Sequence, residues 1–190
     1  MIKTYPYGML SSNIYLAHDG GEGMIIDAGG IPSELLAYIS ANQIKIKYLV
    51  LTHGHFDHIC KIRELMNEFP EASVVYHADE ERVISDFEAN LSLWLGGRAI
   101  NFNLPHKEVR EGDILKIGSL EFEVLHTAGH TPGGICLMCK DEKIIFTGDT
   151  IFDEGFGRTD FKYGDWHELE KSLTRLYEIK NQGFKIYAGH

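Results

Sequence analysis

Seven side chains of the kind that bind metal ions follow four apolar runs of this 190-residue sequence. The densest group is Leu51-Thr52-His53-Gly54-His55-Phe56-Asp57-His58, which holds three histidines and an aspartate within six positions. The others are His130, Asp149 and His190. Neutral imidazole and carboxylate, without thiolate, suit zinc, iron or manganese in a reactive site. The set therefore predicts a two-metal hydrolytic site.

Each of these groups comes just after a stretch that is predicted to be a strand. The stretches are Tyr48 to Leu51 before His53, Phe122 to Leu125 before His130, Ile144 to Phe146 before Asp149, and Phe184 to Tyr187 before His190. In layered α/β folds, reactive side chains gather at the carboxyl ends of strands, where loops project them into a shared crevice. We therefore expect all of them at one edge of the molecule.

The spacing inside the first group separates its members. His53 and His55 are two positions apart, so an extended segment points both the same way. Asp57 and His58 are adjacent and point differently, which allows them to serve a second ion. A helix is predicted from Ile59 to Phe69, and its start beside the group offers donors to negative charge.

The motif His53-x-His55-x-Asp57-His58, followed in order by His130, Asp149 and His190, resembles the metallo-β-lactamase superfamily. The resemblance runs from the turn Asp27-Ala28-Gly29 to the last residue. Within the superfamily, the stretches 129–133 (Gly-His-Thr-Pro-Gly) and 157–161 (Gly-Arg-Thr-Asp-Phe) are similar to short glyoxalase II-like hydrolases. The second stretch also occurs in the related persulfide dioxygenases.

The resemblance implies an α/β (α+β) fold, a four-layer αββα sandwich with metals at one edge. It implies that two divalent ions bind to the chain, zinc first, with iron or manganese as alternatives. It also assigns each residue a role: His53, His55 and His130 hold the first ion, Asp57, His58 and His190 hold the second, and Asp149 bridges them.

The function implied by the resemblance is hydrolysis of a thioester or related ester by a metal-bridging hydroxide, with Asp57 orienting the nucleophile or taking its proton. Arg158 could bind a substrate carboxylate, or it could brace its loop by pairing with Asp160 or Asp153. The alternatives are a mononuclear iron persulfide dioxygenase using His53, His130 and Asp149, a lactonase or other hydrolase of the superfamily, and a non-catalytic metal-binding module.

Two features depart from the family pattern. His190 is the last residue, so we expect either a truncated chain or a weaker second metal position, because chain ends fray unless they are tied down. Glyoxalase II enzymes also carry a further helical domain that grips glutathione, and nothing in this sequence corresponds to it. A small acyl ester or thioester is therefore expected as substrate, rather than a glutathione thioester.

Composition is consistent with one domain over residues 1–190, since 44% of the residues are hydrophobic and 24% are charged. The net charge of −10 argues against a nucleic-acid partner. Neither a signal peptide nor a membrane-spanning stretch is recognised. Cys60, Cys136 and Cys139 make a poor disulfide framework, so we expect a reducing cytoplasm. The oligomeric state is left open.

Alternating strands and helices are predicted along the rest of the chain. The segment from Phe87 to His106 is the least regular, and we interpret it as core filling rather than as a cap beside the metals. Asp27 is expected to support the metal loop without binding metal. Cys136 and Cys139 are three apart on a predicted strand, so they should face opposite sides. The remaining predictions are strand pairs at 13–17 and 24–27, 114–117 and 120–125, and 135–139 and 143–146, a strand at 73–77, and helices at 33–41, 78–87 and 165–181.

Overall fold

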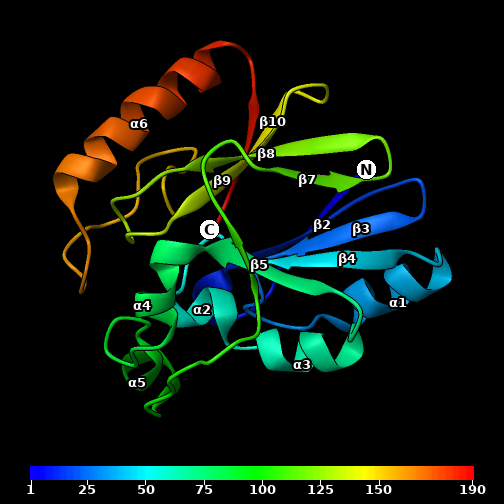
Figure 1. Cartoon of the computed structure of the whole chain (residues 1–190), viewed down its shortest axis with the longest axis horizontal. Helices are drawn as coiled ribbons and strands as arrows, with labels where there is room; N and C mark the ends of the chain where they lie inside the picture. The colour runs from blue at the N-terminus through cyan, green and yellow to red at the C-terminus, as the bar shows by residue number, and fades with distance from the viewer.

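Along the central strands, apolar side chains point alternately to the two faces of the sheet, and those on both faces are buried. Ile14 and Leu16 pack on one face of their sheet, whereas Tyr15 and Ala17 pack on the other. A strand buried on both faces must lie inside a layered fold, because successive side chains point to opposite sides of a sheet. The computed structural model, which describes all 190 residues, has this arrangement: two sheets stacked face to face with helices outside both (Figure 1).

The first sheet has six strands in chain order. Its first three strands are antiparallel, and the pairs from β3 to β6 are parallel. The strands are β1 (Ile2–Pro6), β2 (Asn13–Asp19), β3 (Glu22–Ile26), β4 (Lys45–Val50), β5 (Ser73–His77) and β6 (Lys107–Val109).

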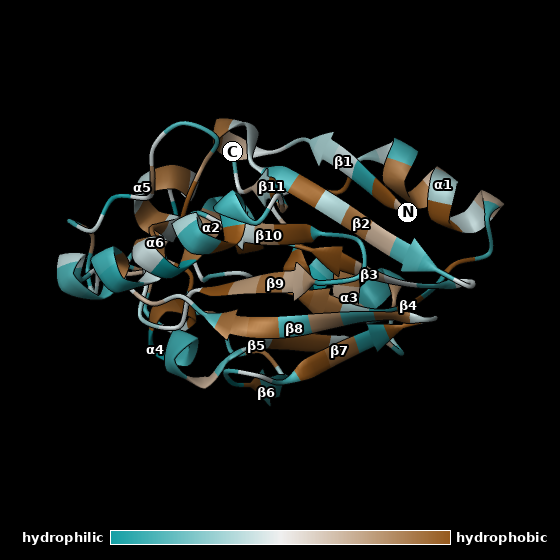
Figure 2. Ribbon diagram, turned by 90° about the horizontal axis from the view of Figure 1, so that it is seen from above, coloured by the Kyte–Doolittle hydropathy of each residue, from teal (hydrophilic) through white to brown (hydrophobic).

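The second sheet has five strands in the order β11-β10-β9-β8-β7. Neighbours are antiparallel except β10 and β11, which run parallel. The strands are β7 (Ile114–Ile117), β8 (Leu120–His126), β9 (Ile135–Cys139), β10 (Ile144–Gly148) and β11 (Lys185–Ala188). Figure 2 shows apolar residues along β9 and β10, as expected for strands with both faces covered.

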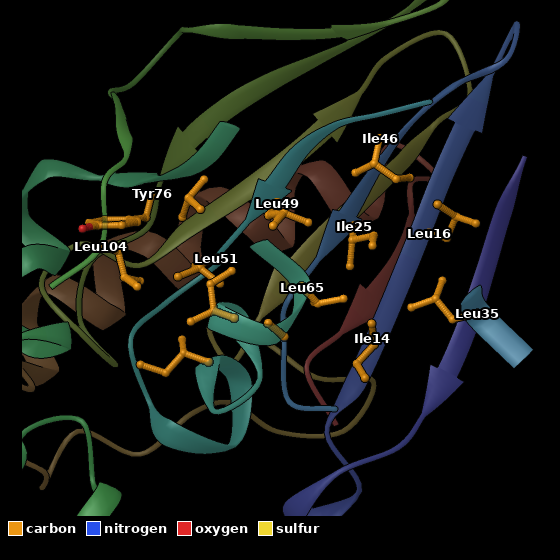
Figure 3. Close-up of a cluster of buried hydrophobic side chains, with 14 of the residues drawn as sticks. Ile14, Leu16, Ile25, Leu35, Ile46, Leu49, Leu51, Leu65, Tyr76 and Leu104 are labelled. Atoms are coloured by element: carbon orange, nitrogen blue, oxygen red, sulfur yellow. The ribbon is translucent and has the colours of Figure 1, made fainter. Parts of the chain in front are cut away.

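Three apolar clusters separate the four layers, which confirms the predicted αββα sandwich. One lies between the first sheet and its helices, and Figure 3 shows Leu16, Leu49 and Leu65 within it. A second lies between the sheets, and a third lies between the second sheet and the long helix α6 (Trp166–Asn181). Cys136 belongs to the third cluster and Cys139 to the second, so the prediction that they face opposite sides is confirmed.

The helices at 33–41 and after Asp165 were predicted correctly. The first is α1 (Ser33–Ala41), and α6 begins where the Asp165 carboxylate accepts the backbone N–H groups of His167 and Glu168. The structure adds elements that the sequence pattern did not indicate: β1, β6, the short 3₁₀ turn η1 (Met9–Ser11) and α5 (Ser92–Gly96).

The helix predicted from Ile59 to Phe69 is confirmed from Ile62 to Glu68, but its start is wrong. The structure has two short helices, α2 (Phe56–Ile59) and α3 (Ile62–Glu68). The Asp57 carbonyl accepts the Ser12 hydroxyl, and the Lys61 N–H donates to the Ala28 carbonyl. Long-range hydrogen bonds thus take the groups that a continuous helix would have paired.

The helix predicted over 78–87 is also shorter than expected. A 3₁₀ turn η2 (Ala78–Glu80) leads into α4 (Glu81–Ile84). The Ile84 carbonyl accepts the Asn90 side chain and the Phe102 N–H instead of a further helical N–H, and this ends the helix. Across the whole fold, none of the helices combines the length and the apolar character needed to cross a membrane.

The N-cap of α6 yields a first prediction. Asp165→Ala removes the acceptor for two backbone N–H groups at the start of α6, so we expect a loss of about 1 kcal/mol in the free energy of unfolding. For a chain of this size the melting temperature should fall by about 2–4 °C. Glu178→Ala, an exposed change within the same helix, is the control and should melt like the parent. Equal melting of both variants would show that the cap contributes nothing.

Candidate metal centre

The carboxyl ends of strands from both sheets meet at one edge, and the predicted ligand residues lie there together. His53 and His55 follow β4, and Asp57 and His58 lie in the adjoining helix α2. The residues from the second sheet are His130 after β8, Asp149 after β10 and His190 after β11. These seven side chains form three overlapping groups in which the donor atoms lie within 4.8 Å of one another.

The first group is His53, His55 and His130. The ring centroids of His53 and His55 are 4.9 Å apart, and that of His130 lies 4.6 Å from His55. All three side chains are buried, and their Nε2 atoms have no hydrogen-bond partner. Buried polar atoms without partners are rare in native proteins and mark a missing ligand or ion. Three imidazole nitrogens converging in this way fit a divalent cation.

The second group is Asp57, His58 and His190. The Nε2 atom of His190 lies 3.3 Å from the Asp57 carboxylate, and the two Nε2 atoms of His58 and His190 are 3.2 Å apart. Asp149 lies between the groups. Its Oδ1 is 3.4 Å from His58 Nε2, and its Oδ2 is 3.4 Å from His190 Nε2 and 3.8 Å from His130 Nε2. One carboxylate therefore faces both groups.

Acceptors behind the rings hold the imidazoles in one tautomer. The Nδ1 atom of His58 donates to the Asp27 carboxylate at 2.9 Å, and that of His53 approaches the Thr52 hydroxyl at 3.1 Å. His130 Nδ1 donates to the Arg158 carbonyl at 2.6 Å, and His190 Nδ1 donates to the Leu10 carbonyl at 3.1 Å. In a neutral ring, a proton on Nδ1 leaves the lone pair of Nε2 directed to the centre, as in a metal site supported from behind.

Burial keeps the first group neutral. Desolvation, reinforced by the neighbouring histidines, lowers the pKa of His53 well below its ordinary value and that of His55 to about 3. Burial also lowers the pKa of His130. These imidazoles are unprotonated at neutral pH, which is the form that binds metal.

The second group has the opposite character. Burial opposes charge on His58, but Asp149 and Asp27 outweigh it and raise the pKa of His58 to about 9. Hydrogen bonds to Asp149 and Asp57 raise the pKa of His190 to about 10. Burial raises the pKa of Asp149, yet His58 and His190 pull it well below its ordinary value. In the metal-free protein this half is a set of paired charges.

Asp27 takes the supporting position that was predicted for it. The carboxylate is buried and accepts the N–H and hydroxyl of Thr52 as well as His58 Nδ1. The Asp27 backbone has a φ of 61°, a left-handed conformation that aspartate tolerates better than most residues. Asp27 thereby fixes the start of the loop that carries His53.

Glu80 is a supporting residue that the sequence reading missed. One of its oxygens accepts the Gly54 N–H and the other accepts the Gly133 N–H, each at 2.7 Å. The loop carrying His53 and His55 is thus tied to the loop carrying His130. Burial raises the pKa of Glu80 to about 7. An acidic residue three positions after β5 was the available signal, but acidic residues at helix starts are so common that nothing marked Glu80.

The backbone that leads to His190 is held at several points. The Gly189 carbonyl accepts the Asn13 N–H at 2.7 Å, and the Gly189 N–H donates to Gly148 at 2.8 Å. The Ala188 carbonyl accepts both the Tyr15 hydroxyl and the Asn13 side chain. The backbone next to His190, where fraying was expected, is therefore hydrogen-bonded to both sheets.

Arg158 lies at the rim of the centre, and its guanidinium forms a bidentate pair with Asp160. It also lies over the Phe161 ring, 4.5 Å from the centroid. Of the two roles considered for Arg158, these contacts favour the loop brace, and the partner is Asp160.

His126, four residues before His130, lies outside the metal-ligand cluster. Its ring stacks on His77 and its Nε2 donates to the Pro132 carbonyl.

The interpretation of residues 87–106 as core filling needs a correction. Phe102 and Leu104 are buried in the core beneath the first sheet, as expected. The preceding part, including Leu91, Trp94 and Leu95, lines a cavity above the metal-ligand residues. The two halves differ because the Asn90 side chain donates to the carbonyls of Ile84 and Ile100 and so ties together the two ends of the turn that carries Trp94. The turn between these anchors is left at the surface.

The support that Asp27 gives to His58 can be tested with Asp27→Asn. The amide NH₂ would face the Nδ1–H of His58, and relief of that clash moves the proton to Nε2, where it blocks the lone pair. We expect metal affinity to fall by about 10–100-fold, measured by cobalt competition against a chelator of known affinity. Asp19→Asn, a surface change at a Ser119 contact, is the matched control. Unaltered affinity in Asp27→Asn would contradict the role.

Comparison with known proteins identifies the family of this chain. The family model of the metallo-beta-lactamase superfamily matches residues 7–190. Hydroxyacylglutathione hydrolase GloC from Haemophilus influenzae is 35% identical over all of this chain and 90% of its own length. The BLEG-1 B3 metallo-beta-lactamase structure has a TM-score of 0.85 and 31% identity, covering 100% of this chain and 91% of that one. The structure of TTHA1623 in a di-iron-bound form gives 0.84 and 29%, covering 99% and 91%. The chain belongs to the metallo-beta-lactamase superfamily.

Proposed function

We propose that this chain is a dinuclear metal-dependent hydrolase of the glyoxalase II type that cleaves a thioester or related ester. The observation that carries the proposal is the position of Asp149, whose carboxylate lies within 3.8 Å of His130 in the first group and within 3.4 Å of His58 and His190 in the second. Paired metal positions that share a carboxylate suit displacement reactions at a carbonyl, whereas structural metal sites are closed and single. Similarity to a relative named as a hydroxyacylglutathione hydrolase supports the reaction class.

In this proposal the ligand roles follow the three groups. His53, His55 and His130 hold one ion, and Asp57, His58 and His190 hold the other. Asp149 bridges them. Zinc is the first choice for a site of imidazoles and carboxylates. Iron, which is named for the similar TTHA1623 structure, and manganese suit the same donors.

Divalent ions bound here would act as Lewis acids toward the acyl carbonyl and would lower the pKa of water to about 7. The chain's own groups complete the reaction. The Asp57 carboxylate borders the cavity and can orient the attacking water and take its proton. The water oxygen adds to the acyl carbon, the C–S or C–O bond breaks, and the departing thiol or alcohol receives the proton.

The partner in this proposal is a small acyl ester or thioester. The net charge of −10 disfavours a polyanion such as nucleic acid. We also propose that residues 1–190 form a single domain, because the metal-ligand residues come from both sheets and neither sheet alone would carry a complete group.

Metal content is the first test, measured by elemental analysis of protein purified without chelators or a histidine tag. The proposal expects about two ions per chain. A single iron would move the assignment to a persulfide dioxygenase that uses His53, His130 and Asp149. Fully loaded protein that turns over nothing on a panel of thioesters, esters and lactones would indicate a non-catalytic metal-binding module.

Asp149→Ala tests the bridge. The variant should lose the ability to hold two ions, and kcat/KM for thioesters should fall by more than about 10²-fold, as when one transition-state contact is removed. Asp153→Ala, an exposed change four residues further on, is the control and should keep both ions and its rate. Two tightly held ions in Asp149→Ala would refute the bridging role.

A further inference from the structure

A cavity of about 310 Å³ opens above the candidate metal centre. Its floor is made by ligand residues, including Asp57, His130 and Asp149. Its volume falls within the range of small-molecule sites. The walls are therefore the part of this chain that selects the substrate.

The walls are apolar and come from distant parts of the sequence. The α5 segment supplies Leu91, Trp94 and Leu95, and the loop after Asp149 supplies Phe152, Phe156 and Phe161. The Trp94 and Phe161 rings approach each other to 6.3 Å between centroids. Phe161 also lies edge-on to His55, 5.5 Å away, so the aromatic surface continues down to the ligand residues.

Several of these large side chains remain in water. Trp94 is 69% exposed and Phe156 is 44% exposed. Large apolar side chains gathered beside a reactive centre indicate a binding surface, because single exposed apolar residues are normal on proteins whereas a contiguous exposed patch is uncommon. Covering this patch with an apolar group would remove it from water and add binding free energy.

The α5 segment presents Trp94 on a fixed backbone. Leu91 has a φ of 65°, and Gly97 closes the helix with a φ of 68°. The fully buried Asn90 spans the turn, accepting the Ser92 N–H and donating to the carbonyls of Ile84 and Ile100. A left-handed leucine persists only where the surroundings hold it. The wall is thus built into the fold.

Above the metal-ligand residues, the cavity walls offer no free cation to a charged acyl group. Arg158 is the one lining residue with a permanent positive charge, and its guanidinium is already paired bidentately with Asp160. A carboxylate bound among these walls would lose hydration without gaining a partner, which is costly. The walls therefore match an uncharged group.

We propose that this cavity binds the uncharged, apolar acyl group of the substrate, so that neutral aliphatic or aromatic acyl thioesters and esters are preferred over acyl groups carrying a carboxylate. The proposal rests on the hydrolase activity proposed above. Trp94 is the specificity-determining residue on the outer wall.

The test uses thioesters of one uncharged thiol, N-acetylcysteamine, with acetyl, butyryl, hexanoyl and adipoyl groups. For the metal-loaded enzyme, kcat/KM should rise by up to about fourfold per added methylene from acetyl to hexanoyl. Adipoyl, which has the six carbons of hexanoyl with a carboxylate in place of the terminal methyl, should be at least about tenfold poorer than hexanoyl. A flat series, or adipoyl equal to hexanoyl, overturns the proposal.

Trp94→Ala should flatten the chain-length series through KM, raising KM for the hexanoyl thioester far more than for the acetyl thioester, while two ions per chain are retained. Leu93→Ala is the matched control, because Leu93 is the exposed neighbour on the same helix and lies outside the cavity lining. Both changes are at the surface, so the fold should tolerate them. Equal effects of the two variants would remove Trp94 from the specificity determinants.

A binding measurement separates failure of this proposal from failure of the hydrolase assignment. Tryptophan fluorescence of the metal-loaded protein is titrated with octanohydroxamate and with the monohydroxamate of suberic acid. The hydroxamate of each can bind the ions, and the two differ only in a methyl or a carboxylate at the far end of the chain. Octanohydroxamate should bind at least about tenfold more tightly. If no thioester or ester is hydrolysed, the proposed activity fails, and the titration still decides the selectivity of the cavity. Equal or tighter binding of the suberic monohydroxamate overturns the apolar site.

Discussion

The apolar contact between the two sheets is the interaction on which the centre depends. His53, His55, Asp57 and His58 belong to the first sheet, whereas His130, Asp149 and His190 belong to the second. The distances between these donors are therefore set by how closely the buried inner faces pack. Hydrogen bonds across the gap, from Ile135 N–H to Thr52 and from Gly133 N–H to Glu80, hold the edge in register. The metal-ligand cluster is a property of the sandwich, because neither sheet carries a complete set of donors.

Much of the centre was predictable because its signals are local. Apolar strands that end in histidine or aspartate can be recognised without knowing what lies beside them, and the αββα layers follow from strand and helix patterns together with the resemblance. The supports behind the rings could not be recognised in this way. The acceptors for His130 and His190 are the main-chain carbonyls of Arg158 and Leu10, which any residue would provide. Residue type carries no information about such contacts.

The predicted ends of two helices were wrong for a related reason. Periodicity predicted one helix through residues 59–69, but the Ser12 hydroxyl and the Ala28 carbonyl compete for backbone groups of Asp57 and Lys61 and split it. In the same way, Asn90 and Phe102 take the Ile84 carbonyl and end α4 early. These partners are remote in sequence, and only the folded chain brings them close. At this edge the long-range bonds also position functional residues, since they hold α2, which carries Asp57 and His58, and leave Trp94 on the open wall.

The two halves of the ligand cluster meet the cost of burial in opposite ways. Burial lowers the pKa of His53, His55 and His130, so these rings are neutral and their Nε2 atoms are left without partners. Around His58 and His190 the carboxylates reverse the effect, and the pKa values rise to about 9 and about 10. Protons therefore balance the buried aspartates before any cation arrives. A divalent ion meets free lone pairs in the first half, but in the second half it must displace protons from rings already paired with carboxylates.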